Sequence, residues 1–251
     1  MPSSLDQLRL TVRISLSYYQ LRMNAQRAAS RPEAAPTEKA ARRLWPQLKN
    51  QNGMDPLHTH VIAAAVAAAT GRAKLLKDVV GSAKEAGLQR TPVEESLLQV
   101  YLFAGYPRAI EALAVLNSIW PRTQSAEQVP QAKWAEFGEQ LCRRVYGRNF
   151  EKLNENIGEA HPDLRAWMVS EGYGKVLSRP GLDTVSRELC TVGALTAIQA
   201  PRQLQAHILG ARNVGASGPQ IRHAIELGAL GCGIRAWKNA HTLFVTVMGS
   251  D

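Results

Sequence analysis

The amino-acid sequence predicts an all-α protein built from two related helical units. Of its 251 residues, 45% are hydrophobic and 20% are charged, as in ordinary globular proteins. Alanine is abundant and aromatic residues make up only 6%, a composition that favours helices over strands. From about residue 58 onward, Gly and Pro divide the chain into segments of helical length. The order of helices and breaks in residues 57–120 then returns in residues 185–248.

The N-terminal region has a pattern of its own. Residues 1–35 are rich in Arg and Ser and poor in acids, as organelle transit peptides are. Apolar and polar residues alternate from Leu8 to Tyr18, which predicts a half-buried strand. A helix stays open as an alternative, because Leu8, Val12 and Leu16 also share one helical face. We expect an ordered arm here, with a targeting segment as the alternative.

The following stretch connects this arm to the helices. Residues 27–56 contain four prolines and predict a polar connection with a short helix around Glu38–Leu48. Residues 1–56 together are therefore interpreted as an N-terminal arm and linker.

Start and stop signals delimit the helices of the first unit. Gly71 and Gly87 stand where a helix C-terminus favours glycine. Thr91 followed by Pro92 is a start signal, with Thr as N-cap and Pro at the first helical position, and Gly105 is the next stop. The helices predicted from these signals are Val61–Thr70, Ala73–Ala86, Thr91–Ala104 and Pro107–Ile119.

The second unit follows the first at a constant spacing. Superposing Gly87 on Gly215 gives an offset of 215 minus 87, or 128 positions. We interpret residues 57–120 as the first unit, and residues 121–251 as an extra helical segment followed by the second unit. The same offset pairs Ala69 with Ala197, Leu76 with Leu204, Ala83 with Ala211, Leu102 with Leu230, Gly105 with Gly233 and Ala112 with Ala240.

Charge and cysteine content limit the classes of function. The net charge of +9 suits an anionic substrate, a nucleic acid or an acidic partner. Nucleic-acid binding is disfavoured, because the basic residues are spread along the chain without interleaved aromatics. No apolar run approaches the ~20 residues of a membrane span. The cysteines Cys142, Cys190 and Cys232 form no C-x-x-C, which argues against a disulfide framework or a zinc cluster. A reducing compartment such as the cytoplasm is expected, with a mitochondrion or another organelle as the alternative.

The strongest candidate site lies in residues 171–207. Glu188 falls near the start of an apolar helical run, and His207 falls in the next helix, after a break at Ala200-Pro201. A buried Glu beside a His forms a minimal proton-transfer unit. The alternatives stay open at this stage: an acid near a helix start also serves the helix dipole, and a buried His also serves as a hydrogen-bonded core residue.

Four segments carry a resemblance to a known family. They are EGYGKVLSRPGLD, RELCTVGALTA and QAHILGARNVGAS in the second unit and EESLLQVYLFAGYPRAIEAL in the first. They resemble the carboxymuconolactone decarboxylase family, to which the AhpD-like alkylhydroperoxidases also belong. The likeness covers about residues 57–120 and 137–248. It implies an AhpD-like all-α fold of repeated units, assembled into trimers or hexamers.

The resemblance also separates the branches of that family. Redox members carry a C-x-x-C ahead of the matching His, but here those two positions are Ala200 and Gln203. Peroxidase chemistry needs a thiolate and a resolving cysteine, so it is not expected. The decarboxylase branch implies an enzyme without cofactor or metal that acts on a small anionic lactone or carboxylic acid.

Within that branch the resemblance suggests a role for each candidate residue. His207 would deliver a proton to the carbon that loses carbon dioxide, while Glu188 orients the imidazole. Arg187 or Arg179 would bind a substrate carboxylate, and Tyr173 would add a hydroxyl to the pocket wall. The alternative to substrate binding is that both arginines form ion pairs at the protein surface.

The first unit departs from the family pattern, which opens a second hypothesis. At the offset of 128, His60 stands in place of Glu188 and Val79 in place of His207. The first unit keeps Glu95 and Gln99 of the pattern instead, so at most one site per chain is expected. The alternative function is a degenerate family member that acts as a structural or assembly subunit, in an organellar complex for example.

Overall fold

Every regular element of the described chain is a helix, which confirms the all-α prediction. The structure is a computed structural model that describes residues 35–51, 53–123 and 127–249. The strand predicted for Leu8 to Tyr18 lies outside these residues. The α-helices are α2 (Glu38–Lys49), α3 (Pro56–Ala69), α4 (Ala73–Glu85), α5 (Arg90–Leu98), α6 (Tyr101–Ile119), α7 (Trp134–Tyr146), α8 (Phe150–Ala160), α9 (Pro162–Trp167), α10 (Thr184–Ala197), α11 (Pro201–Asn213), α12 (Gly218–Gly228) and α13 (Ile234–Met248). Two 3₁₀ turns (η1, Gln131–Lys133; η2, Gly147–Asn149) and a π-helix (η3, Met168–Leu177) complete the order.

Helix boundaries repeat at the offset found in the sequence. Helix α3 covers residues 56–69 and α10 covers 184–197, so both ends differ by 128, as 184 minus 56 and 197 minus 69. Helices α4 and α11 differ by the same amount at both ends. An aspartate caps the N-terminus of each central helix, Asp55 on α3 and Asp183 on α10, by accepting a backbone N–H. These helices of the two units therefore begin and end at corresponding residues, and their central helices share the same kind of N-cap.

The turns that follow corresponding helices have a positive φ in both units, even where the residue differs. Gly71 after α3 has a φ of 66°, and Gln199 at the corresponding position after α10 has a φ of 58°. Left-handed backbone favours glycine, so Gln199 occupies a conformation that is costly for a side chain. Gly87 and Gly215 follow the next helix of each unit, also with positive φ. The glycine stop predicted after Ala86 is confirmed.

The third helix of the first unit differs from its prediction. It begins at Arg90, with Gln89 rather than Thr91 as the N-cap, and it ends at Leu98 instead of continuing to Ala104. Just after the end of this helix, the Gln99 side chain is hydrogen-bonded to Arg187 of α10. The backbone break predicted at Gly105 is present, as a kink inside α6.

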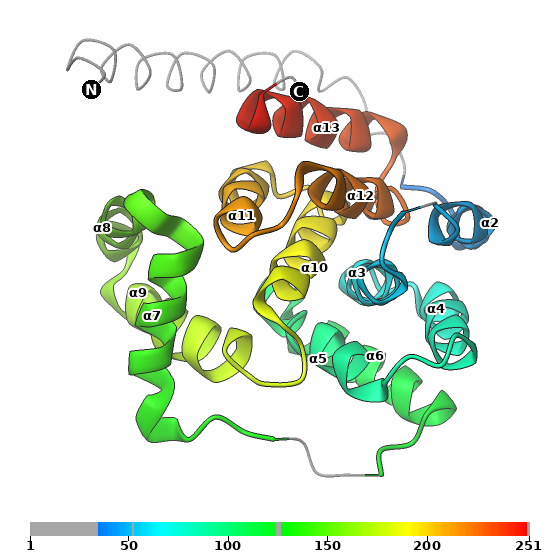
Figure 1. Cartoon of the computed structure of the whole chain (residues 1–251), viewed down its shortest axis with the longest axis horizontal. Helices are drawn as coiled ribbons and strands as arrows, with labels where there is room; N and C mark the ends of the chain where they lie inside the picture. Colours follow the sequence, from blue (N-terminus) through cyan, green and yellow to red (C-terminus); the bar gives the residue numbers. More distant parts are fainter. Residues whose placement is uncertain (1–34, 52, 124–126, 250–251) are drawn as a thin grey trace. The chain divides into compact units, whose positions relative to one another are not determined.

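Helices α3 and α10 form the centre of the described fold. Nearly all of their residues are buried, and the two helices pack directly against each other, as Figure 1 shows. Gly193 on α10 permits this approach, because a Cβ atom there would lie 2.7 Å from Cγ2 of Ile62 on α3. Burying an aliphatic side chain contributes ~1.5–3 kcal/mol, so the buried Val, Ile and Leu side chains of these two helices stabilise the core.

The segment between the units forms a smaller core. Helix α7 packs against η3, and this pair packs against α11 (Figure 1). Two glycines bring the backbones of α7 and η3 together, because a Cβ on Gly138 would lie 1.9 Å from the carbonyl oxygen of Val169. On Gly174 it would lie 1.8 Å from the carbonyl oxygen of Trp134. The buried side chains of this core are Leu141, Cys142, Val145, Phe150, Tyr173 and Leu177.

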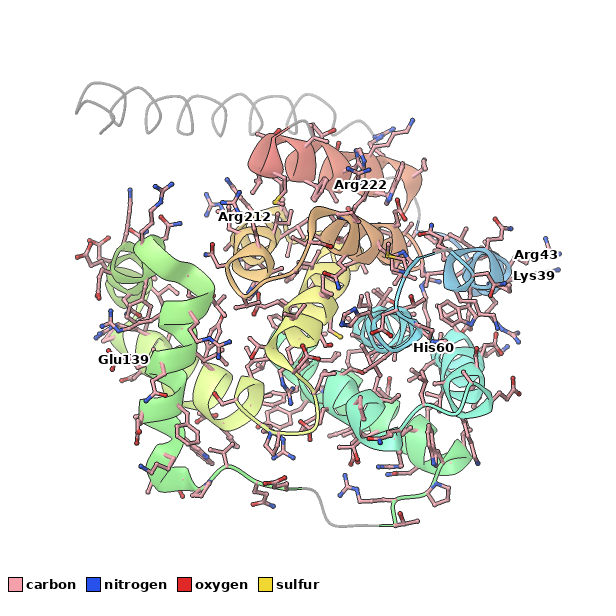
Figure 2. All side chains as sticks on the ribbon, viewed as in Figure 1. Lys39, Arg43, His60, Glu139, Arg212 and Arg222 are labelled. Carbon is pink, nitrogen blue, oxygen red and sulfur yellow. The ribbon has the colours of Figure 1, made fainter. Side chains whose placement is uncertain are left out.

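The basic residues are distributed over many helices. Figure 2 labels Lys39 and Arg43 on α2, Arg212 on α11 and Arg222 on α12, all extending from the ribbon, whereas His60 lies among packed helices. This distribution agrees with the charge pattern of the sequence. Within the described residues, no helix is long and apolar enough to cross a membrane.

Candidate functional site

Glu188 and His207 meet in the structure. Glu188 lies in the second turn of α10, and His207 lies in the second turn of α11, after the break at Ala200-Pro201. Nδ1 of His207 lies 2.8 Å from Oε2 of Glu188, a hydrogen-bonding distance. Glu188 is 2% exposed and His207 is 7% exposed. The two residues that the sequence singles out are thus brought together in a nearly dry environment.

The hydrogen bond assigns different tasks to the two ring nitrogens. An ionised carboxylate can only accept, so Nδ1 of His207 carries the hydrogen that is donated to Glu188. Among the described residues, no group bonds Nε2 of the same ring. Nε2 is therefore the atom that can take a proton from a bound molecule or give one to it. The contact with Glu188 fixes the orientation of the imidazole.

Aromatic side chains from two other parts of the chain surround the imidazole. The ring centroid of Phe103, from α6 of the first unit, lies 5.9 Å from that of His207. The centroid of Tyr146, at the end of α7, lies 6.3 Å away. The site is therefore assembled from the first unit, the intervening segment and the second unit together.

A glycine provides space for the carboxylate. Gly210 lies three residues after His207 on the same face of α11, and a Cβ atom there would lie 2.8 Å from Oε2 of Glu188. The same Cβ would lie 2.7 Å from Cγ1 of Val145. Any larger residue at position 210 would displace the Glu188 carboxylate.

Tyr173 is linked to the imidazole through Tyr146. Its hydroxyl donates to the hydroxyl oxygen of Tyr146 at 2.6 Å, and Tyr146 is the one whose ring contacts His207. Burial raises the pKa of both phenols, and the negative charge of Glu188 raises the pKa of each further. Burial and the same carboxylate raise the pKa of the Cys142 thiol. These three groups are neutral near pH 7 and act as hydrogen-bond donors or packing groups.

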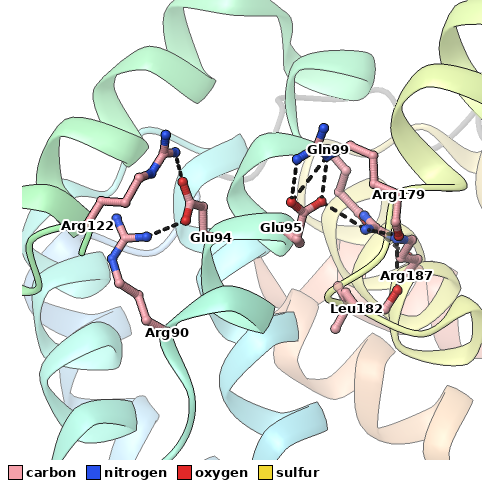
Figure 3. A network of polar contacts seen from close by, with 8 residues as sticks. All are labelled: Arg90, Glu94, Glu95, Gln99, Arg122, Arg179, Leu182 and Arg187. Carbon is pink, nitrogen blue, oxygen red and sulfur yellow. Dashed lines mark hydrogen bonds and ion pairs between the residues drawn. The ribbon is translucent and has the colours of Figure 1, made fainter. Parts of the chain in front are cut away.

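Arg179 and Arg187 bind a buried carboxylate instead of facing an open site. Figure 3 shows both guanidinium groups around Glu95 of α5, at 2.9 Å each. Arg187 is 1% exposed and also donates to Gln99 and to the carbonyl oxygens of Leu182 and Arg179. Burial lowers the pKa of Arg187, and the hydrogen bond and charge of Glu95 oppose that shift. The substrate-binding role predicted for the two arginines stays a prediction, while their observed contacts join the two units.

A counterpart of this cluster, the His223 cluster, lies at the corresponding positions. The offset of 128 pairs Glu95 with His223, Arg179 with Gln51 and Arg187 with Thr59. Nδ1 of His223 lies 2.8 Å from Oε1 of Gln51, and Nε2 lies 3.0 Å from Oγ1 of Thr59. In each unit, one residue of the third helix is thus held by a loop residue and a central-helix residue from the other half of the chain.

The corresponding positions of the first unit hold no proton-transfer pair. His60, which replaces Glu188, donates from Nδ1 to the Pro56 carbonyl oxygen at 2.7 Å, and its Nε2 lies 3.0 Å from Ser82 Oγ. Ser82 corresponds to Gly210, because 210 minus 82 is also 128. Burial is the main cause that lowers the pKa of His60. Both nitrogens of this neutral ring are satisfied within the protein.

Reasoning from the sequence missed three residues of the site: Phe103, Tyr146 and Gly210. Gly210 had a usable signal, because a glycine inside a helix and three residues from a candidate His indicates a close approach. Phe103 and Tyr146 had none, since both reach the imidazole through tertiary packing. No group of three or more His, Cys, Asp or Glu side chains suited to a metal ion occurs in residues 35–51, 53–123 and 127–249.

Comparisons with known proteins agree with this arrangement. The model of the carboxymuconolactone decarboxylase family matches residues 35–118 and again residues 162–244. Both matches include the element ahead of the central helix, α2 in the first and η3 in the second.

Three individual relatives add detail. The chain is 24% identical over 208 residues to peroxisomal protein 2 of Schizosaccharomyces pombe, covering 78% of this chain and 97% of that protein. It is 28% identical over 82 residues to 4-carboxymuconolactone decarboxylase of Acinetobacter baylyi, covering 33% of this chain and 61% of the relative. It is 39% identical over 61 residues to nitrosuccinic acid decarboxylase of Metarhizium robertsii, covering 24% of this chain and 43% of the relative. The chain therefore spans less than two thirds of either decarboxylase.

Proposed function

The chain belongs to the carboxymuconolactone decarboxylase family, and on this premise we propose that it is an enzyme that works without a cofactor. It removes a carboxylate as carbon dioxide from a small anionic lactone or carboxylic acid, or moves a proton on such a molecule. The observation that carries the proposal is the 2.8 Å contact between Glu188 and His207, which leaves Nε2 of the imidazole available.

The proposed reaction needs one acid and one place for the electron pair. The bond between the carboxyl carbon and its neighbour breaks, carbon dioxide leaves, and the electron pair is delocalised onto an electron-withdrawing group of the substrate. Protonated His207 then gives the Nε2 proton to the carbon that lost its carboxylate, and the ring is reprotonated by solvent. Glu188 balances the charge of the imidazolium and keeps Nε2 directed at the substrate.

The names of two relatives support one substrate class. One relative is a decarboxylase of a carboxylated lactone and the other of a nitro acid. In both kinds of molecule, the electron pair left by carbon dioxide is accepted by oxygen atoms, of a carbonyl or of a nitro group. The proposed substrates are therefore carboxylic acids in which such a group can accept the electron pair left on the carbon that loses its carboxylate.

The test is carbon dioxide release from a panel of carboxylated unsaturated lactones, β-keto acids and α-nitro acids. We expect turnover of at least one compound, and a fall of ~10²–10⁴ in kcat for His207→Gln and Glu188→Gln, as for other general acids. Circular dichroism and size-exclusion chromatography check that both variants keep their fold and assembly. Turnover unchanged in His207→Gln would refute the assignment of the proton donor.

The alternative function is a structural or assembly subunit, favoured by two observations. The peroxisomal relative matches over nearly its whole length, and the first unit lacks the pair. The alternative expects the native protein to travel in a larger complex, and a fusion of residues 1–56 to a fluorescent protein to enter an organelle. A trimer or hexamer of this chain alone, found by light scattering and active on the panel, would refute it.

A further inference from the structure

Two tyrosines lie near the imidazole of the candidate site, one in contact with it and the other in contact with the first tyrosine. Tyr146 ends α7 and Tyr173 lies in the π-helix η3, and their ring centroids are 5.6 Å apart. Of these two tyrosines, Tyr146 alone has a ring contact with His207 in the described part of the chain, with 6.3 Å between the ring centroids. The two hydroxyls are therefore not equivalent with respect to a molecule bound at Nε2.

The direction of the hydrogen bond between the phenols separates their roles. Tyr173 is 4% exposed, and Tyr146 is the one acceptor that the described residues offer to its hydroxyl. Tyr173 therefore donates to Tyr146, at 2.6 Å. The Tyr146 hydroxyl accepts this bond with its oxygen and still carries its own hydrogen. None of the described residues accepts a hydrogen bond from that hydrogen.

The surroundings make this donor effective. Burial raises the pKa of Tyr146, so the phenol stays protonated and cannot serve as a base. Phe103 packs edge-on against the imidazole as well. The backbone contacts at Gly138 and Gly174 lock α7 against η3, which fixes the spacing of the two phenols. A donor held rigidly in such a site stabilises a developing negative charge better than water does.

We propose that Tyr146 donates a hydrogen bond to the substrate oxygen that becomes negative when carbon dioxide leaves, with Tyr173 as a positioning residue. The proposal rests on the proposed function, because it requires a substrate at Nε2 of His207. It assigns the substrate-facing hydroxyl to Tyr146, whereas the family resemblance implied that Tyr173 would add a hydroxyl to the pocket wall. It also specifies the ligand, a planar oxyanion such as an enolate or a nitronate.

The first experiment measures binding of the nitronate form of 3-nitropropionate, an analogue of the enolate, by isothermal titration calorimetry at a pH above the pKa of the nitro compound, where the nitronate persists. We expect Tyr146→Phe to weaken binding about 10- to 100-fold, as for loss of one hydrogen bond to a charged group. The matched control is Tyr106→Phe, which removes a hydroxyl from a side chain that is 61% exposed and is expected to bind as the wild type. His207→Gln reports separately on the imidazole.

The second experiment tests the positioning role. Tyr173→Phe is expected to weaken nitronate binding about 3- to 10-fold, because Tyr146 then rotates more freely. If Tyr173 acts through Tyr146, the double variant binds as weakly as Tyr146→Phe alone. Additive losses, as expected from independent packing effects, would refute the positioning role.

The outcomes separate this proposal from the proposed function. Binding that is lost in His207→Gln but unchanged in Tyr146→Phe overturns the role of Tyr146 and leaves the proposed function standing. A wild-type protein that neither binds the nitronate nor decarboxylates any panel compound overturns both. Thermal unfolding of each variant identifies any loss that comes from the fold.

Discussion

Two corresponding places in the units share a backbone and differ in chemistry. In the second unit, Glu188 and His207 form a buried pair, and Gly210 leaves room for the carboxylate. In the first unit, His60 stands at the acid position and Ser82 at the glycine position. The helices that carry these residues have the same boundaries at an offset of 128 positions.

The difference shows what turns a buried histidine into a candidate acid. Lys49 donates to the Ser82 hydroxyl, which in turn donates to Nε2 of His60, while Nδ1 is used by the Pro56 carbonyl. Trp45, which corresponds to Tyr173, packs edge-on against the same ring. His60 therefore has no nitrogen left for a ligand. His207 has one, because its neighbours are a carboxylate on one side and aromatic rings on the others.

The largest effect on stability is expected where the comparison involves charge. Glu95→Ala leaves Arg187 buried without its counterion and should lower the free energy of unfolding by ~3–5 kcal/mol. A change in the His223 cluster, Gln51→Ala, removes hydrogen bonds to His223 and Glu226 and should cost about 1 kcal/mol. Urea unfolding measures both, and equal losses would mean that the two clusters contribute alike.

A matched pair of alanine substitutions tests the two small residues. Gly210→Ala places a methyl group against the Glu188 carboxylate and should cost ~1–3 kcal/mol, less any gain in helix propensity. It should also lower turnover at least ~10-fold, because displacement of a catalytic group is costly. Ser82→Ala removes the bond to His60, and about 1 kcal/mol of stability, without changing turnover. An unaffected rate in Gly210→Ala would show that the position of Glu188 is not critical.

The smallest effect concerns Glu226, the acid that accompanies the His223 cluster. Nδ1 of His223 lies 3.7 Å from Oε2 of Glu226, and this contact is the main cause that lowers the pKa of Glu226 from its ordinary value of 4.5. A carboxylate with a lowered pKa contributes stability above pH 4.5, and that contribution is lost as the pH falls through the folded-state pKa. Glu226→Gln should therefore cost about 1 kcal/mol near neutral pH, and nothing at a pH below the folded-state pKa. Denaturant unfolding across the pH range measures the difference, which a pH-independent loss would contradict.

Local signals predicted much of the fold. Glycines after α4 and α11 stand next to the helix ends that they mark, so these ends could be placed from the sequence alone. Helix starts were placed less well: the first helix of the first unit was predicted to begin at Val61, but it begins at Pro56, after the capping Asp55. The end of α5 at Leu98 was not predicted, because no glycine or proline marks it.

The candidate site was predictable only where it followed the repeat. Glu188 and His207 lie on adjacent helices of one unit, so their spacing indicated that they could meet. The buried role of Arg187 required knowing that Glu95, 92 residues earlier, would face it. Tyr146 reaches the imidazole through tertiary packing, which no motif in the sequence indicates.

The most direct test of the account compares two histidine substitutions. His207→Gln and His60→Gln are measured side by side for kcat/KM on the best compound of the decarboxylation panel, with unfolding curves for both. We expect kcat/KM to fall by at least ~10²-fold in His207→Gln. We expect an unchanged rate for His60→Gln, with reduced stability from the lost core hydrogen bonds. Equal rates for the two variants would contradict the assignment of the site to the second unit.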